Sequence, residues 1–68
     1  MDGITIVVNG QGQSCPPCSV LELIDSRKLS RRALVVELNG AILTDEQWPL
    51  IQLQDDDVLE LLTFVGGG

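Results

Sequence analysis

The chain has 68 residues, enough for one small domain with a single core, because only about 60% of the unfolded surface is buried at this size. Its formal net charge of −6 argues against nucleic acid and anionic membrane surfaces as partners, since both would repel it. No apolar run approaches the ~20 residues that span a bilayer, and the first residues lack the pattern of a signal peptide. We therefore expect a cytoplasmic protein that binds other proteins.

The N-terminal segment predicts a β-hairpin. Ile4 to Val8 alternates around Thr5 and then meets Asn9 and Gly10, a dipeptide that tolerates the positive φ angles of a type I′ turn. The return strand, from about Gln11 to Cys15, is short and polar. We expect it at an edge of the sheet.

A helix is predicted next, from about Val20 to Ser26 or slightly beyond. Ser19 and Glu22 have the spacing of a capping box. All four basic residues follow within six positions, and we expect them to complement the negative end of the helix: Arg27, Lys28, Arg31 and Arg32. The apolar stripe that would pack on a sheet is Val20, Leu23 and Ile24, with Leu21 at its margin.

A second hairpin follows the helix. Residues 34–38 alternate as a strand, Asn39 and Gly40 repeat the turn signal, and residues 41–43 return. Thr44 and Gln47 resemble a second capping box, so one short helical turn is predicted over residues 45–48, ended by Pro49.

The last part of the chain predicts a turn and a long strand. Asp55 to Asp57 form a solvated turn, and Val58 to Val65 form the last strand. Trp48 is expected to cover the core, although tryptophan is also common in binding hot spots. Three consecutive carboxylates point in different directions, and a chain with two cysteines and no histidine does not supply the four ligands of a structural zinc site.

The order of these elements predicts an α+β fold. A mixed sheet of four or five strands with one main helix across one face is the β-grasp arrangement of ubiquitin-like proteins. In it the last strand lies centrally, beside the first strand and parallel to it. We expect a β-grasp domain over residues 1–65 and a flexible glycine tail over residues 66–68, because glycine loses the most backbone freedom on ordering.

The last strand presents two different faces. Alternation sends Leu59 and Leu61 to one face, and Leu62 and Phe64 to the other. Glu60 shares the second face and is costly to bury unpaired, so Leu59 and Leu61 are predicted to lie beneath the helix. Leu62 and Phe64, with the adjoining Val65, are then the predicted partner-binding residues beside the tail. The patch could instead be a self-association contact.

Cys15 and Cys18 form a C-x-x-C just before the helix. A reactive, low-pKa cysteine occupies this position in thiol oxidoreductases. The larger α/β unit that normally carries the motif is missing, so we favour a structural role, with a facultative disulfide as the next option. Because the chain has neither His nor Tyr, the usual catalytic pairs cannot be assembled. We therefore expect no catalytic residue, metal site or cofactor.

The sequence resembles the ThiS family of sulfur carrier proteins of thiamine biosynthesis. The resemblance covers nearly the whole chain and rests on order, spacing and length. The resembling features are the short opening strand and the segment Val36 to Gly40, which Ile42 follows. Trp48 comes a few residues later, and the chain ends with Asp57 to Glu60 and then Phe64 to Gly68.

The resemblance implies a function for Gly68. A ThiF-like enzyme would adenylate its carboxylate, and a persulfide, such as that of a cysteine desulfurase, would supply sulfur to form a thiocarboxylate. A thiazole synthase would then receive the sulfur, while Gly66 and Gly67 give the tail reach and thinness. Three alternatives stay open: a carrier for molybdopterin synthesis or another pathway, a small C-x-x-C redox protein, and a ubiquitin-like module that is never activated.

Overall fold

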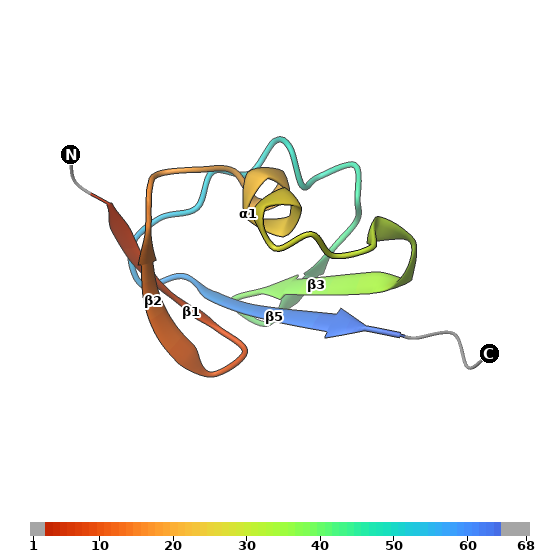
Figure 1. The fold of residues 1–68 in the computed structure, drawn as a ribbon, viewed down its shortest axis with the longest axis horizontal. Helices are drawn as coiled ribbons and strands as arrows, with labels where there is room; N and C mark the ends of the chain where they lie inside the picture. Colours follow the sequence, from red (N-terminus) through yellow and green to blue (C-terminus); the bar gives the residue numbers. More distant parts are fainter. Residues whose placement is uncertain (1–2, 65–68) are drawn as a thin grey trace.

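A computed structural model describes residues 3–64, and its ribbon shows one helix lying across one face of a sheet (Figure 1). The sheet has five strands in the order β2-β1-β5-β3-β4. The elements are β1 (Ile4–Val8), β2 (Gln11–Cys15), α1 (Val20–Ser26), the short 3-10 helix η1 (Arg31–Ala33), β3 (Leu34–Leu38), β4 (Ala41–Leu43) and β5 (Val58–Thr63).

The topology confirms the predicted α+β, β-grasp fold. β5 lies in the middle of the sheet, parallel to β1 on one side and antiparallel to β3 on the other. The polar strand β2 lies at an edge, as its composition predicted. The strand that leads toward the end of the chain therefore has neighbours on both sides.

Both Asn-Gly turns have the backbone that the sequence predicted. The φ angles are 50° at Asn9 and 83° at Gly10, and 51° at Asn39 and 89° at Gly40. Two consecutive positive φ angles define the type I′ turn, whose twist matches that of the flanking strands. Each turn fixes the register of its hairpin, β1 with β2 and β3 with β4.

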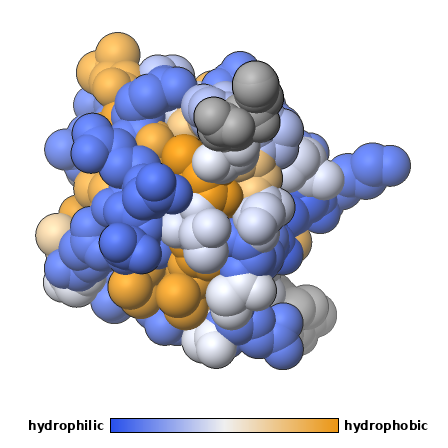
Figure 2. Space-filling model, turned by 90° about the vertical axis from the view of Figure 1, so that its left-hand side faces the viewer, coloured by the Kyte–Doolittle hydropathy of each residue, from blue (hydrophilic) through white to orange (hydrophobic). Residues whose placement is uncertain are grey.

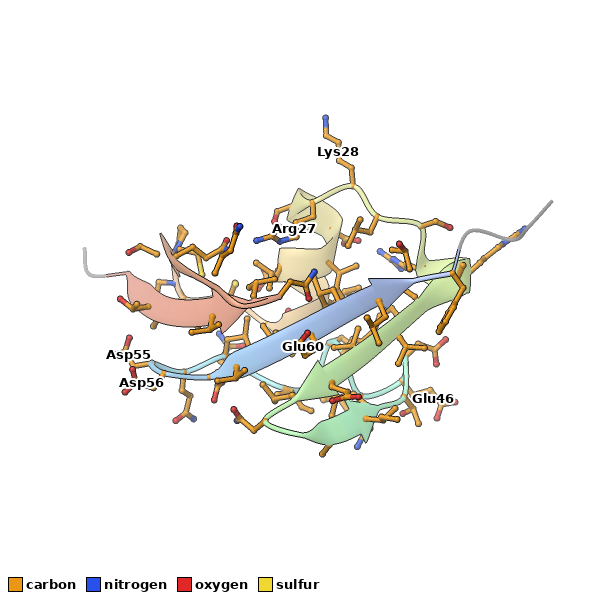
Figure 3. The ribbon with its side chains drawn as sticks, turned by 90° about the horizontal axis from the view of Figure 1, so that it is seen from below. Arg27, Lys28, Glu46, Asp55, Asp56 and Glu60 are labelled. Carbon is orange, nitrogen blue, oxygen red and sulfur yellow. The ribbon has the colours of Figure 1, made fainter. Side chains whose placement is uncertain are left out.

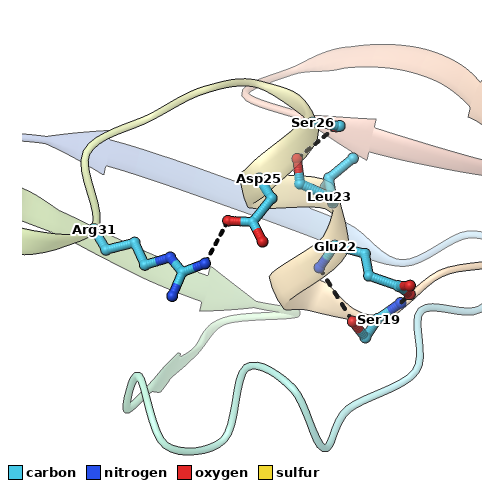
Figure 4. A network of polar contacts seen from close by, with 6 residues as sticks. All are labelled: Ser19, Glu22, Leu23, Asp25, Ser26 and Arg31. Atoms are coloured by element: carbon cyan, nitrogen blue, oxygen red, sulfur yellow. Dashed lines mark hydrogen bonds and ion pairs between the residues drawn. The ribbon is translucent and has the colours of Figure 1, made fainter.

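The predicted capping box at the start of α1 is present (Figure 4). The Ser19 hydroxyl accepts a hydrogen bond from the Glu22 amide at 3.1 Å, and a Glu22 carboxylate oxygen accepts one from the Ser19 amide at 2.8 Å. These bonds satisfy two backbone donors that a helix start otherwise leaves free. They explain why so short a helix begins at Val20.

Two of the four basic residues that follow α1 have side-chain partners in the structure. The last turn of α1 contains no basic residue. Arg27 caps the helix through its backbone, while its guanidinium donates to the Gln13 side chain. Arg31 forms a 2.7 Å ion pair with Asp25 (Figure 4). The side chains of these two arginines thus bind polar side chains near the end of α1. Whether the basic residues complement the helix end stays a prediction.

The short helical turn predicted over residues 45–48 is present as turn backbone and does not develop into a helix. Residues 45–50 form a series of turns. Only half of the capping pattern is present, in which the Thr44 amide donates to the Gln47 side chain at 2.8 Å. The backbone hydrogen bonds here link residues three apart, as from Leu50 N to Gln47 O at 3.0 Å. Pro49 has no N–H and cannot donate to such a bond.

The core lies between α1 and the face of the sheet that α1 covers, which we call the covered face. Trp48 is 2% exposed, which confirms its predicted core role, and Leu53 is buried although no periodicity marked it. Leu53 is held there because its amide donates to the Cys18 carbonyl at 2.9 Å. The buried apolar residues are Ile6, Val8, Val20, Leu23, Ile24, Leu34, Val36, Trp48, Leu53, Leu59 and Leu61.

The surface at the β1–β2 end of the molecule is mixed. Figure 2 shows apolar side chains in a band between hydrophilic flanks.

Among the described residues, 3–64, we find no helix long and apolar enough to cross a membrane.

Candidate functional site around the last strand

β5 is paired along both edges. On one edge it forms five register pairs with β3, from Leu38 opposite Leu59 to Leu34 opposite Thr63. On the other edge the register with β1 covers only Val7 opposite Val58 and Val8 opposite Leu59, because β1 ends at Val8. Without further contacts, the C-terminal half of β5 would lack partners on that edge.

Asn9 replaces the missing part of β1. Its side-chain oxygen accepts a hydrogen bond from the Leu61 amide at 2.7 Å, and its side-chain nitrogen donates to the Leu61 carbonyl at 3.2 Å. The Asn9 backbone amide also donates to the Leu59 carbonyl at 2.9 Å. A turn residue thus satisfies both backbone groups of Leu61, which an amide side chain can do because it carries a donor and an acceptor.

Asn39 holds the start of β5 from the other side. Its side-chain oxygen accepts from the Val58 amide at 2.9 Å, and its side-chain nitrogen donates to Asp57 at 3.0 Å. Asp57 in turn accepts from the Gln54 amide at 2.8 Å. Both Asn-Gly turns therefore anchor β5 as well as reversing the chain. The sequence showed the turns, but nothing local in it indicated these contacts, which join residues up to 52 positions apart.

The acidic turn before β5 is more structured than predicted. Asp55 accepts a hydrogen bond from the Thr5 amide at 2.8 Å, and the Asp56 amide donates to the Thr5 carbonyl at 2.7 Å. Asp56 takes a positive φ of 71°. Asp55 and Asp56 are exposed, as expected of a solvated turn, yet the segment is tied to β1 and fixes where β5 begins.

β5 ends at Thr63, two residues earlier than predicted. The pairing continues one step further, because the Phe64 amide donates to the Ala33 carbonyl at 2.7 Å. Val65 and the predicted tail residues Gly66, Gly67 and Gly68 lie outside the described residues.

The two faces of β5 are distributed as predicted. Leu59 is 0% and Leu61 6% exposed, whereas Leu62 is 45% and Phe64 59% exposed. We call the sheet face opposite α1 the open face. From the strand registers, its residues include Val7, Val35, Glu37, Ile42, Val58, Glu60 and Leu62. The alternation along β5 adds Phe64 just after the strand.

The open face collects apolar side chains that the core does not use. Among residues 3–64, five large hydrophobic side chains are exposed, and four of them lie on this face; the fifth is Leu50. Leu62 and Phe64 are thus both exposed on this face, as the alternation predicted; their role in partner binding stays a prediction. Val58 and Ile42 were not singled out, although alternation along their strands would have placed them there.

The cysteine pair does not have the features of a reactive thiol site. Cys15 and Cys18 are free and half-buried. Burial raises the pKa of Cys18 to about 11, and the neighbouring Cys15 thiol and Glu22 carboxylate add to the rise. A thiol oxidoreductase requires the opposite shift, because the thiolate is the nucleophile.

A surface hollow lies on the helix side of the molecule. It has a volume of about 350 Å³ and is lined by Leu21, Arg31, Asp45, Glu46, Trp48 and Pro49. These residues supply no nucleophile with an adjacent base. Within residues 3–64, no group of three or more potential metal-ligating side chains occurs.

Comparison with known proteins places the chain in one family. The ThiS family model matches residues 6–68. The sulfur carrier protein ThiS of Bacillus subtilis (strain 168) is 36% identical over 50 residues, which cover 74% of this chain and 76% of that protein. An uncharacterized protein, ycf40, from Pyropia yezoensis is 35% identical over 66 residues, covering 96% of this chain and 93% of the relative.

A solved structure has the same fold. The crystal structure of the thiamine biosynthesis protein (ThiS) from Geobacter metallireducens matches with a TM-score of 0.80 at 32% identity, covering 96% of this chain and all of that one. The family match spans nearly the whole sequence, and the structural match agrees with it. The chain therefore belongs to the ThiS family.

Proposed function

We propose that this protein is a sulfur carrier whose Gly68 carboxylate is activated by a ThiF-like enzyme and converted to a thiocarboxylate for thiazole formation in thiamine biosynthesis. The observation that carries the proposal is the family match, which runs through the glycine ending to residue 68. The fold is consistent with it, because the strand leading to that ending is central and anchored on both edges. Residues 1–65 act as the scaffold and residues 66–68 as the tail.

The chemistry requires an external enzyme. A carboxylate becomes an electrophile only when one of its oxygens is made a leaving group, so a Gly68 oxygen attacks the α-phosphorus of ATP and displaces pyrophosphate. The terminal sulfur of a persulfide, such as that of a cysteine desulfurase, then attacks the acyl carbon and displaces AMP. A second thiol cleaves the resulting acyl disulfide and leaves the thiocarboxylate. The partner supplies the charge stabilisation for adenylation, so the carrier itself is not the enzyme.

The open face is the proposed docking surface for the activating enzyme. Leu62 and Phe64 are exposed at the end of β5 that leads to the tail. An exposed apolar patch of this kind marks interaction sites in many small proteins. Together with Val65, these residues would guide the tail into the partner's cleft, and a thiazole synthase would use the same end of the molecule.

The alternative of a C-x-x-C redox protein is weaker. The raised pKa of Cys18 opposes a nucleophilic role at neutral pH, and the family match accounts for nearly the whole chain without it. Nothing in the fold favours a carrier role in molybdopterin synthesis over one in thiamine synthesis.

The direct test is removal of Gly68. We expect the shortened chain to keep the wild-type unfolding midpoint in urea, because the residue has no side chain to pack, and to lose all carrier-dependent ATP–pyrophosphate exchange with the ThiF-like enzyme of its own organism. As a control, Gly12→Ala should fold and still support exchange, because an added Cβ at Gly12 meets nothing within 4 Å. Undiminished exchange by the shortened, folded chain would overturn the proposal.

A further inference from the structure

Two carboxylates face one another in the middle of the open face. Glu37 of β3 and Glu60 of β5 are direct register partners, so their side chains leave the sheet on the same side, with Cβ atoms about 5 Å apart. Both are half-buried. Figure 3 views the molecule from this side and shows Glu60 at the centre of β5. We call Glu37 and Glu60 the acidic pair.

The acidic pair has no cationic neighbour within the part of the chain that the structure describes. The one ion pair found in residues 3–64 joins Arg31 to Asp25, and neither glutamate side chain takes part in a hydrogen bond there. Like charges directly opposite one another in a sheet are destabilising. Two uncharged side chains at these positions would avoid that cost.

Apolar side chains surround the acidic pair. Ile42 is the register partner of Glu37 on β4, and it is 68% exposed. Val58 and Leu62 lie two residues to either side of Glu60 on the same face of β5, 40% and 45% exposed. A protein that covers these apolar side chains must also cover the two carboxylates between them.

Covering the acidic pair sets a requirement on the partner. Burying a charge without a counter-ion is strongly unfavourable, and removing one member of a buried pair is correspondingly costly. A purely apolar partner surface would leave two negative charges dehydrated and close together. A basic side chain among apolar ones meets the requirement, and arginine suits it best, because its planar guanidinium can donate to two carboxylates at once.

We propose that the acidic pair is the recognition point on the open face for a basic side chain, preferably arginine, presented by the adenylating enzyme within an apolar surface. This rests on the proposed function for the identity of the partner. The inference adds to the proposed function two residues that determine specificity, Glu37 and Glu60. It also adds the side chain that the partner must present, a basic one.

The test compares two double variants that remove the same charge. Glu37→Gln with Glu60→Gln neutralises the acidic pair, while Asp45→Asn with Glu46→Gln neutralises two acidic residues of the turn segment 45–50, on the helix side. The equilibrium dissociation constant for the ThiF-like enzyme of the same organism is measured without ATP at low and high salt. The urea midpoint of each chain is measured separately.

We expect the acidic-pair variant to bind at least about tenfold more weakly, with a smaller salt dependence, while its urea midpoint is equal to or above that of the wild type. The control should bind within about twofold of the wild type. Equal weakening by both variants, or unchanged binding of the acidic-pair variant, would overturn the inference. If the wild type binds the enzyme but is never adenylated, the proposed function fails while this comparison still decides the inference; if it does not bind, both fail.

Discussion

The two faces of the sheet are built from the same strands but differ in what they contribute. On the covered face, Leu59 and Leu61 are almost fully buried among core residues. On the open face, Leu62 of the same strand and Phe64 just after it are about half exposed. Glu60 lies opposite Glu37 and has no ion-pair partner among the described residues. One face therefore stabilises the fold, while the other keeps apolar area and charge that the isolated fold does not use.

The largest expected difference is in stability. Leu59→Ala leaves a cavity at a 0% exposed position and should lower the free energy of unfolding by about 3 kcal/mol. Leu62→Ala, on the open face of the same strand, should lower it by less than about 1 kcal/mol. Urea denaturation followed by circular dichroism measures both. Equal losses would mean that the two faces do not differ as described.

Partner binding should show the reverse order. Phe64→Ser removes an exposed aromatic side chain beside the end of β5 and should weaken binding to the ThiF-like enzyme about tenfold, as loss of an interface aromatic does. Its cost to folding should stay below about 1 kcal/mol, because Phe64 is 59% exposed. The matched control is Leu50→Ser, at the exposed apolar residue outside the open face. A loss of several kcal/mol in stability with normal binding would show that Phe64 belongs to the core.

The smallest effect is expected at the cysteines. Replacing Cys15 and Cys18 with Ser should leave thiocarboxylate formation essentially unchanged, because the sulfur is proposed to reside on the terminus. Thiocarboxylate yield per adenylated chain measures this. Loss of the product in a folded double variant would favour the redox alternative.

The pKa of Cys18 gives an independent check. Burial raises it from 9.0 to about 11, so at pH 8 iodoacetamide should alkylate Cys18 on the order of 100-fold more slowly in the folded chain than in the urea-unfolded chain. Because the folded pKa is the higher one, its contribution to stability is complete below pH 9 and is lost as the pH rises toward 11. Equal alkylation rates in the two states would contradict the burial of this thiol.

The parts of the fold that the sequence predicted are those that short-range signals specify. The two Asn-Gly turns, the Ser19 capping box and the alternation along β5 each depend on residues a few positions apart. The predicted faces of β5 were correct because a single glutamate, Glu60, is enough to decide which side avoids the core.

The features that were missed depend on long-range contacts. The amide side chain of Asn9 binds Leu61, and Leu53 is buried through a backbone bond to Cys18. The acidic pair exists only because β3 and β5 pair in one particular register, which no local pattern specifies. The short turn at residues 45–48 was predicted from equally local signals, the Thr44 and Gln47 pair and the Pro49 that ends it.

In the proposed function, Gly68 carries the sulfur. The most direct measurement is the intact mass of the protein isolated from its native cells, followed by fragmentation to locate any modification. We predict a population whose mass corresponds to replacement of one oxygen by one sulfur at the carboxyl group of Gly68. Sulfur found only on Cys15 or Cys18, a chain that extends beyond Gly68, or an unmodified terminus in cells that contain the adenylating enzyme and sulfur donor would contradict the claim.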